Sequence, residues 1–132
     1  ARGLPPALLF PAFAFGLLST GVLNVNNMRD IHNDAASGKR TLVVRMGSRN
    51  AKRYQSFLVL GGAVCLVAFT LLLYPSRITA WLFLLTTPLF ALHLRAVWTT
   101  TDPRQLDPQL KKLALGTFFT ALLFAAGCIF TV

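Results

Sequence analysis

The chain is poor in charge, and above all in negative charge. Of its 132 residues only 13% are charged and 55% are hydrophobic, whereas a soluble domain carries roughly a quarter charged residues. It has no glutamate, and its four acidic residues are all aspartates. Together with a mean hydropathy of +0.60, this balance excludes an ordinary soluble domain and is typical of a membrane protein.

Several kinds of site are also missing. Cys65 and Cys128 each lie in an apolar stretch, so we interpret them as packing residues and not as a disulfide or metal pair. The sequence shows no Ser/His/Asp arrangement, no cysteine-rich zinc spacing and no phosphate-binding glycine loop. The net charge of +9 comes from cations that flank apolar segments, and this pattern predicts contact with anionic lipid and no nucleic-acid partner.

Four apolar segments are long enough to cross a bilayer core of ~30 Å as helices that rise ~1.5 Å per residue. They cover residues 4–25, 57–74, 78–98 and 113–132. Their apolar character is continuous, which excludes the alternating strands of a membrane barrel. We therefore predict an all-α membrane protein with four transmembrane helices. Pro88 within the third span predicts a local kink, and the segment YPSR at residues 74–77 predicts a tight turn.

The distribution of cations predicts the orientation of these spans, because Lys and Arg concentrate in cytoplasmic loops. Seven of them lie in the connection formed by residues 26–56, whereas the turn at residues 74–77 has only Arg77. The connection between the last two spans is also basic. We expect both long connections to face the cytoplasm, with Arg2 as a small counter-signal. The chain begins at Ala1 without a basic leader, so we expect no signal peptide and a fragment or processed chain.

The stretch NVNNMRDIHNDAASGKR, residues 24–40, is the main polar segment. If the first helix continues through Asn26, then Asn26, Asp30 and Asp34 share one face, with successive Cα atoms ~6 Å apart along the axis. Like charges at this spacing repel, and carboxylate and amide oxygens are suitable ligands for Mg²⁺. From spacing alone, a metal site and a solvated helix end are equally good interpretations.

The residues that follow this stretch are basic. Gly38 allows a turn, after which Lys39, Arg40 and Arg45 provide donors for diphosphate oxygens. Aspartates, metal and cations together predict a diphosphate clamp. The more distant cations Arg49, Lys52 and Arg53 are better explained as topology signals.

The two histidines and the two other aspartates have simpler interpretations. His32 points away from the shared face of the motif, and we expect it to be exposed to solvent. His93 lies near Trp98 at the end of a span and is interpreted as an interfacial anchor. Asp102 and Asp107 each precede a proline, and we interpret them as turn formers without a catalytic role.

The longer run NNMRDIHNDAASGKRTLVVRMG, residues 26–47, resembles the UbiA superfamily of intramembrane prenyltransferases. The resemblance rests on N-N-x-R-D-x-x-x-D followed by G-K-x-T-L-x-V-R-x-G, and it is closest to the menaquinone-pathway branch that acts on 1,4-dihydroxy-2-naphthoate. It implies that the four spans are the C-terminal part of a nine-helix bundle in the inner (cytoplasmic) membrane, carrying the second of two aspartate-rich motifs. The missing N-terminal helices of the same protein would carry the first.

The resemblance also implies an activity. A polyprenyl group would pass from polyprenyl diphosphate to 1,4-dihydroxy-2-naphthoate with loss of CO₂, giving demethylmenaquinone. Asp30 and Asp34 would be the catalytic carboxylates that bind Mg²⁺, with Asn26 as a supporting metal ligand. The cations Lys39, Arg40 and Arg45 would bind diphosphate. Because half of the expected site is absent, we expect the chain alone to show little turnover.

Two alternatives stay open at this stage. One is a UbiA-type prenyltransferase for another aromatic acceptor. The other is a non-enzymatic transport or scaffold subunit whose basic loop binds anionic lipid. The sequence lacks an obvious row of polar residues along its spans that would form a transport path.

Overall fold

The computed structural model describes residues 3–131 and contains helices and turns but no strand in that range. Arg2 and the last residue of the fourth predicted span, Val132, lie outside the described residues. In chain order the elements, with η for a 3₁₀ helix, are η1 (Pro6–Leu8), α1 (Leu9–Arg29), α2 (Ile31–Ala36), α3 (Leu42–Met46), α4 (Ser48–Leu73), η2 (Ile78–Thr86), α5 (Thr87–Thr99), η3 (Pro103–Leu106) and α6 (Asp107–Thr131).

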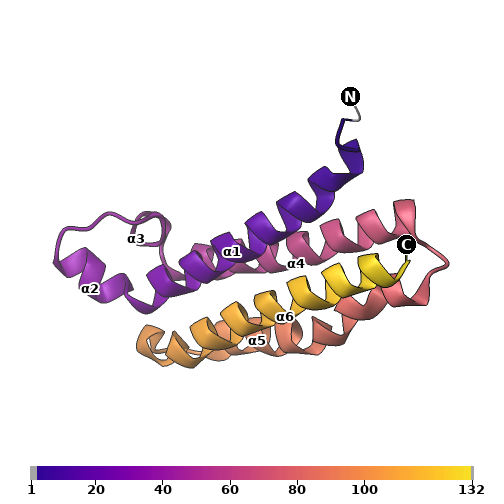
Figure 1. The fold of residues 1–132 in the computed structure, drawn as a ribbon. Helices are drawn as coiled ribbons and strands as arrows, with labels where there is room; N and C mark the ends of the chain where they lie inside the picture. Colours follow the sequence, from indigo (N-terminus) through magenta and orange to yellow (C-terminus); the bar gives the residue numbers. More distant parts are fainter. Residues whose placement is uncertain (1–2, 132) are drawn as a thin grey trace.

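Four long helical rods make up the bundle, and Figure 1 shows their arrangement. The helical segments Pro6–Arg29, Ser48–Leu73, Ile78–Thr99 and Pro103–Thr131 are each long and apolar enough to cross a membrane, so the prediction of an all-α protein with four such helices is confirmed. The helices extend beyond the predicted spans, since α4 begins at Ser48 and α6 at Asp107. Hydropathy marks where the apolar part of a helix ends, whereas backbone hydrogen bonding continues into the polar residues beyond it.

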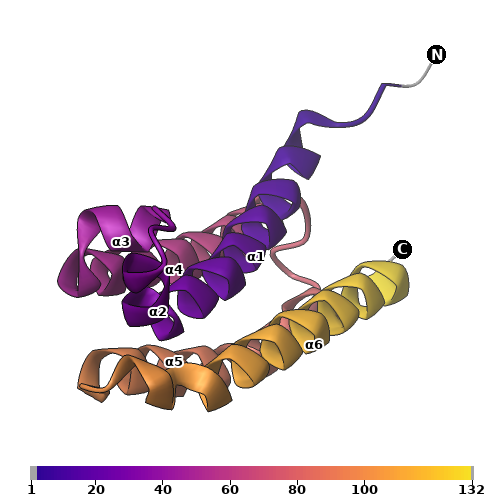
Figure 2. The same ribbon diagram turned by 90° about the vertical axis from the view of Figure 1, so that its left-hand side faces the viewer.

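The rods pack in two closely contacting pairs, α1 with α4 and α6 with η2 and α5, as Figures 1 and 2 show. Gly62 allows α4 to pack closely against α1, because a Cβ atom there would lie 2.9 Å from Leu18 Cγ and 3.2 Å from the Ala14 carbonyl oxygen. A Cβ atom on Gly127 would overlap the Thr79 carbonyl oxygen. Small residues at such positions let helix backbones come close in a membrane.

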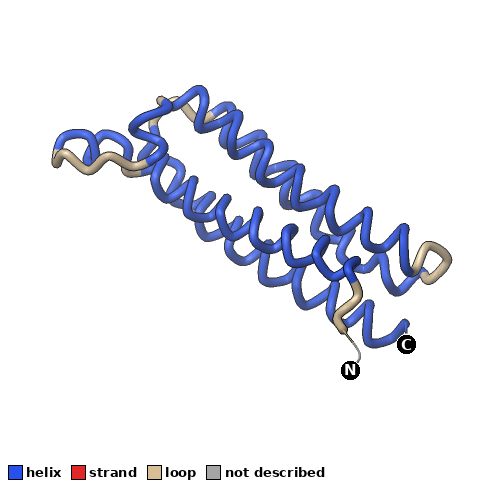
Figure 3. Tube along the Cα trace, turned by 90° about the horizontal axis from the view of Figure 1, so that it is seen from above, coloured by secondary structure: helices blue, strands red, loops and turns tan. Residues whose placement is uncertain are grey.

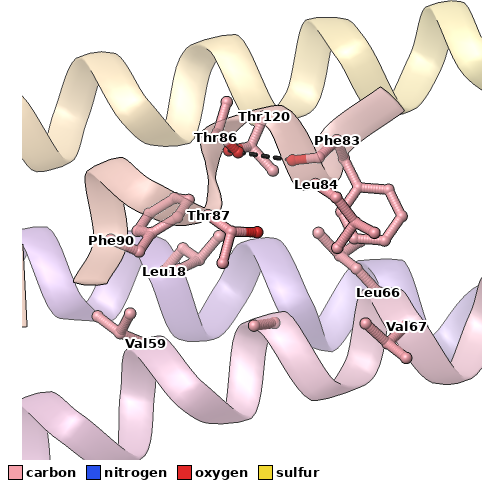
Figure 4. Close-up of a pocket in the computed structure, with 11 residues that line it drawn as sticks. Leu18, Val59, Leu66, Val67, Phe83, Leu84, Thr86, Thr87, Phe90 and Thr120 are labelled. Carbon is pink, nitrogen blue, oxygen red and sulfur yellow. Dashed lines mark hydrogen bonds between the residues drawn. The ribbon is translucent and has the colours of Figure 1, made fainter. Parts of the chain in front are cut away.

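The third span changes from a 3₁₀ helix to an α-helix halfway along (Figure 4). At the change, Thr86 Oγ1 donates to the Phe83 carbonyl oxygen at 2.7 Å and lies 2.7 Å from Thr120 Oγ1. Pro88 occupies the first turn of α5, where a missing N–H costs no helical hydrogen bond. The local kink expected at Pro88 stays a prediction, and what the structure shows beside it is the change from a 3₁₀ helix to an α-helix.

Both long connections lie at the same end of the bundle (Figure 1, Figure 3). The opposite end holds the turn between α4 and η2, in which the Arg77 N–H donates to the Tyr74 carbonyl oxygen at 3.2 Å. The predicted turn at residues 74–77 is therefore confirmed. The fold thus brings the polar segment after α1 and the connection between α5 and α6 close to each other.

Candidate active site at the end of α1

The polar motif lies where α1 ends. Asp30 has φ −95° and ψ 10° and separates α1 from α2. The first helix therefore continues through Asn26, as the spacing argument assumed, and is interrupted at Asp30. Short side chains such as Asp favour turns because they compete for local backbone hydrogen bonds. The Asp30 N–H still donates to the Asn26 carbonyl, and the Asp34 N–H to the Asp30 carbonyl, at 3.2 and 2.8 Å. The spacing of one turn between the three residues survives the break.

Arg29 donates hydrogen bonds to side-chain oxygens of three other residues. Its Nε and Nη2 atoms donate to the two carboxylate oxygens of Asp30 at 2.9 and 3.2 Å. Nη2 also donates to Asn26 Oδ1 at 2.8 Å, and Nη1 donates to Asp107 Oδ1 at 2.7 Å. A planar guanidinium makes such forked contacts with carboxylates. The interpretation of Asp107 as a simple turn former is therefore wrong, whereas Asp102 does form a turn, with Oδ1 accepting from the Arg104 N–H at 3.1 Å.

Asp34 lies on α2 and is buried, with 9% of its surface exposed. Its Oδ2 atom has no hydrogen-bond partner among residues 3–131. A buried carboxylate oxygen without a partner is costly, so this position is suited to a bound cation. The oxygens of Asn26 and Asp30 already face one cation, the Arg29 guanidinium. These donors fit a hard divalent ion such as Mg²⁺, which takes oxygen ligands.

The residues described do not complete a metal site by themselves. Within residues 3–131, no three His, Cys, Asp or Glu side chains are close enough to hold a metal ion. Mg²⁺ is commonly held by one or two carboxylates together with water and substrate phosphates. The aspartates here can therefore supply part of a ligand set.

The electrostatics keep Asp30 ionised. The hydrogen bond from Arg29 is the largest influence and lowers the pKa of the Asp30 carboxyl, while desolvation opposes it. The charges of Arg29 and Lys39 lower this pKa further. A carboxylate in this state is ready to bind a cation at neutral pH.

The three predicted diphosphate contacts follow a tight turn. Gly38, with φ 77°, ends α2, while the Lys39 N–H donates to the Asp34 carbonyl at 2.8 Å and the Gly38 N–H to the Ala35 carbonyl at 3.3 Å. This is the Schellman pattern of helix ends. The side chains of Lys39, Arg40 and Arg45 are exposed and form no ion pair within the described range.

An open hollow of about 260 Å³ lies beside the motif. Its lining comes from both connections at this end of the bundle: Arg29, Asp30, His32, Asn33, Arg104 and Asp107. His32 is exposed, as predicted. Asn26 and Asp34 are not part of this lining, so Asp30 is the one predicted metal ligand that lines the hollow.

A buried polar ladder lies near the motif and was not predicted. Asn24 Nδ2 donates to Gln55 Oε1 at 3.0 Å and to the Ala51 carbonyl at 3.2 Å, and Gln55 Nε2 lies 3.0 Å from His93 Nε2. His93 is only 2% exposed, so its interpretation as an interfacial anchor is wrong. The ladder links α1, α4 and α5; its only sequence signal is the polar residues isolated within apolar stretches.

Known proteins match most of this chain. The UbiA prenyltransferase family matches residues 1–123. The 1,4-dihydroxy-2-naphthoate octaprenyltransferase of Escherichia coli (strain K12) is 47% identical over 127 residues, which are 96% of this chain and 41% of that protein. The protein of the same name from Haemophilus influenzae (strain ATCC 51907 / DSM 11121 / KW20 / Rd) is 37% identical over 92% of this chain and 39% of its own length.

A more distant relative carries the same name. The 1,4-dihydroxy-2-naphthoate octaprenyltransferase of Mycobacterium leprae (strain TN) is 34% identical over 88% of this chain and 38% of its own length. The chain thus spans about two fifths of the length of these relatives. No solved structure gives a significant match. From the family match, which covers nearly the whole chain, and from its four membrane-spanning helices, we conclude that this chain belongs to the UbiA prenyltransferase family and is a multi-pass membrane protein.

Proposed function

We propose that this chain is part of an enzyme that transfers a polyprenyl group from polyprenyl diphosphate to 1,4-dihydroxy-2-naphthoate, with loss of CO₂ to give demethylmenaquinone. The observation that carries the proposal is the 47% identity, over 96% of this chain, to a protein named for octaprenyl transfer to that acceptor. Because the chain spans only part of that relative, the remaining helices and the first aspartate-rich motif would come from the N-terminal part of the same protein.

The membrane orientation forms part of this proposal. We place the protein in the inner (cytoplasmic) membrane, with the connection formed by residues 26–56 in the cytoplasm. Two features support this: the cations concentrate in the two long connections, and both connections lie at the same end of the bundle.

The metal in this proposal is Mg²⁺, held by Asn26, Asp30 and Asp34. The buried, unpartnered Oδ2 of Asp34 and the lowered pKa of Asp30 support the assignment. When bound, Mg²⁺ would neutralise part of the negative charge of the diphosphate. Arg29 orients the Asp30 carboxylate by donating hydrogen bonds to both of its oxygens.

The chain's own cations have a role as the allylic C–O bond breaks. The diphosphate leaves with its negative charge, and the carbocation-like carbon is attacked by the electron-rich ring of the acceptor. Lys39, Arg40 and Arg45 are exposed cations that lie in α3 or in the link between α2 and α3, and they would stabilise the departing diphosphate by charge-assisted hydrogen bonds.

The prenyl chain would lie outside these four helices. One apolar cavity between the helices measures about 30 Å³ and is lined by residues such as Leu18, Leu66 and Phe83 (Figure 4). This is roughly the space of one water molecule, far too little for an isoprenoid tail. Exposed apolar side chains along the rods, for example Phe57 and Phe118, offer the tail a surface shared with the rest of the protein.

Prenyl transfer by the full-length protein tests the proposal. Membranes containing it should convert labelled polyprenyl diphosphate and 1,4-dihydroxy-2-naphthoate to prenylated product with Mg²⁺ and not after chelation. In a mixture of aromatic acids, 1,4-dihydroxy-2-naphthoate should be the preferred acceptor. Preference for another acid would refute the assigned acceptor, and the absence of any transfer would refute the enzyme.

A further inference from the structure

We propose that Arg104, on η3 between the last two spans, is a phosphate-binding residue that lines the same open hollow as Asp30. The proposal deepens the proposed function and rests on it. It adds a binding residue from the second connection at this end of the bundle, which the motif of residues 26–47 does not include.

The backbone of η3 is firmly placed. The Asp102 carboxylate accepts from the Arg104 N–H at 3.1 Å, and Leu106 is 2% exposed in the same core cluster as Val25. The next residue, Asp107, accepts from Arg29 at 2.7 Å. Fixed points on both sides of Arg104 therefore hold its backbone beside the motif, which reduces the entropy lost when the side chain binds a ligand.

The guanidinium of Arg104 is available for a ligand. Its side chain is exposed and lines the hollow, and it makes no ion pair or side-chain hydrogen bond among residues 3–131. Arg29 lines the same hollow but already donates to Asn26, Asp30 and Asp107. An arginine with free donors matches phosphate oxygens in a forked geometry.

The cations predicted from the sequence come from the other side of the motif. α3 packs against α1 and α4 through the buried Val43, and Figures 1 and 2 show α3 and the start of α6 on opposite sides of α2. Lys39, Arg40 and Arg45 do not line the hollow. Of the two arginines that line this hollow, Arg104 is therefore the one whose donors are free to bind a phosphate.

Two sources can supply such a phosphate, the prenyl diphosphate and an anionic lipid headgroup. The experiment measures pyrophosphate binding with Mg²⁺ by calorimetry, using the full-length protein in nanodiscs of neutral lipid. Arg104→Gln should weaken binding roughly tenfold, the loss expected for one charge-assisted hydrogen bond, and Arg104→Lys should recover part of it. Arg77→Gln, which removes an exposed cation at the other end of the bundle, is the matched control and should leave binding unchanged.

Kinetics and lipid binding complete the test. In the same protein, Arg104→Gln should raise KM for the prenyl diphosphate and leave KM for the acceptor unchanged. Unchanged pyrophosphate affinity, or an effect confined to the binding of anionic vesicles, would overturn the proposal. If Asp30→Ala abolished transfer while Arg104→Gln had no effect, only the role of Arg104 would fail. A wild-type protein without prenyl transfer would refute the proposed function, and pyrophosphate binding would still decide the role of Arg104.

Discussion

Arg29 and Asp107 are 78 positions apart in the sequence, yet Arg29 Nη1 donates to Asp107 Oδ1 at 2.7 Å. This contact joins the end of α1 to the first residue of α6. The same guanidinium also donates to Asp30 and Asn26. Arg29 therefore links the polar motif to the connection between α5 and α6. The candidate site is therefore built from two separate parts of the chain.

Removing this ion pair should destabilise the bundle slightly. The two side chains are 27% and 50% exposed, so solvent screens their attraction. A double-mutant cycle with Arg29→Gln and Asp107→Asn should give a coupling free energy of about 0.5–1 kcal/mol in unfolding experiments in micelles. The coupling should shrink in about 1 M salt. A coupling near zero at low salt would show that the contact does not contribute to stability.

The lowered pKa of Asp30 predicts a pH dependence of stability. Because the folded-state pKa lies below the unfolded value, ionised Asp30 contributes stability above its ordinary pKa, and that contribution is lost as pH falls through the folded pKa. The difference in unfolding free energy between wild type and Asp30→Asn should therefore be largest near neutral pH and disappear in acid. A difference that is independent of pH would contradict the assigned role of Arg29.

The buried ladder should be more sensitive to mutation than an ordinary interhelical hydrogen bond. Gln55→Leu preserves most of the volume but leaves His93 Nε2 without its partner, and it should lower the free energy of unfolding by roughly 1–3 kcal/mol. Thr86→Val is a matched control, because Thr120 keeps its bond to the Gly116 carbonyl. Its cost should be about 0.6 kcal/mol, the average for such bonds in membranes. If Gln55→Leu and Thr86→Val lowered the free energy of unfolding equally, breaking the ladder would cost no more than breaking an ordinary interhelical hydrogen bond.

Close packing between α1 and α4 predicts a contrast between two glycines. Gly62→Ala should cost roughly 1–3 kcal/mol through overpacking, because its Cβ atom would press on Leu18 and on the Ala14 backbone. Gly16→Ala should change the free energy of unfolding by less than about 0.5 kcal/mol, since nothing lies within 4 Å of the added atom. Unfolding in mixed micelles measures both variants, and tolerance of alanine at residue 62 would show that the helices are less closely packed than described.

Much of the fold was predictable because its cause is local. The spans could be predicted from continuous apolar runs. Such runs indicate membrane-spanning helices whichever other helices they pack against. The segment of residues 26–56 was predicted as a loop, yet α2, α3 and the first turns of α4 lie within it. Hydropathy has no signal for a short polar helix such as α2, which depends on its capping turn at Gly38.

Long-range contacts explain what the sequence could not predict about the site. Asn26, Asp30 and Asp34 were predicted as site residues from their spacing and from the family resemblance, whereas the pairing of Arg29 with Asp107 requires α6 to return beside α1. His93 resembles an interfacial residue in the sequence, but its burial depends on Gln55 from another helix. Residues brought together only by folding carry no pattern in a single sequence.

Asp30 is proposed as a catalytic carboxylate of a metal-dependent prenyltransferase, and prenyl transfer by the full-length Asp30→Ala variant tests this role. With Asn50→Ala, which removes an exposed polar side chain on α4, as the control, Mg²⁺-dependent prenylation of 1,4-dihydroxy-2-naphthoate should fall at least about 100-fold in the Asp30 variant only. Wild-type activity in the folded Asp30→Ala protein would contradict the account.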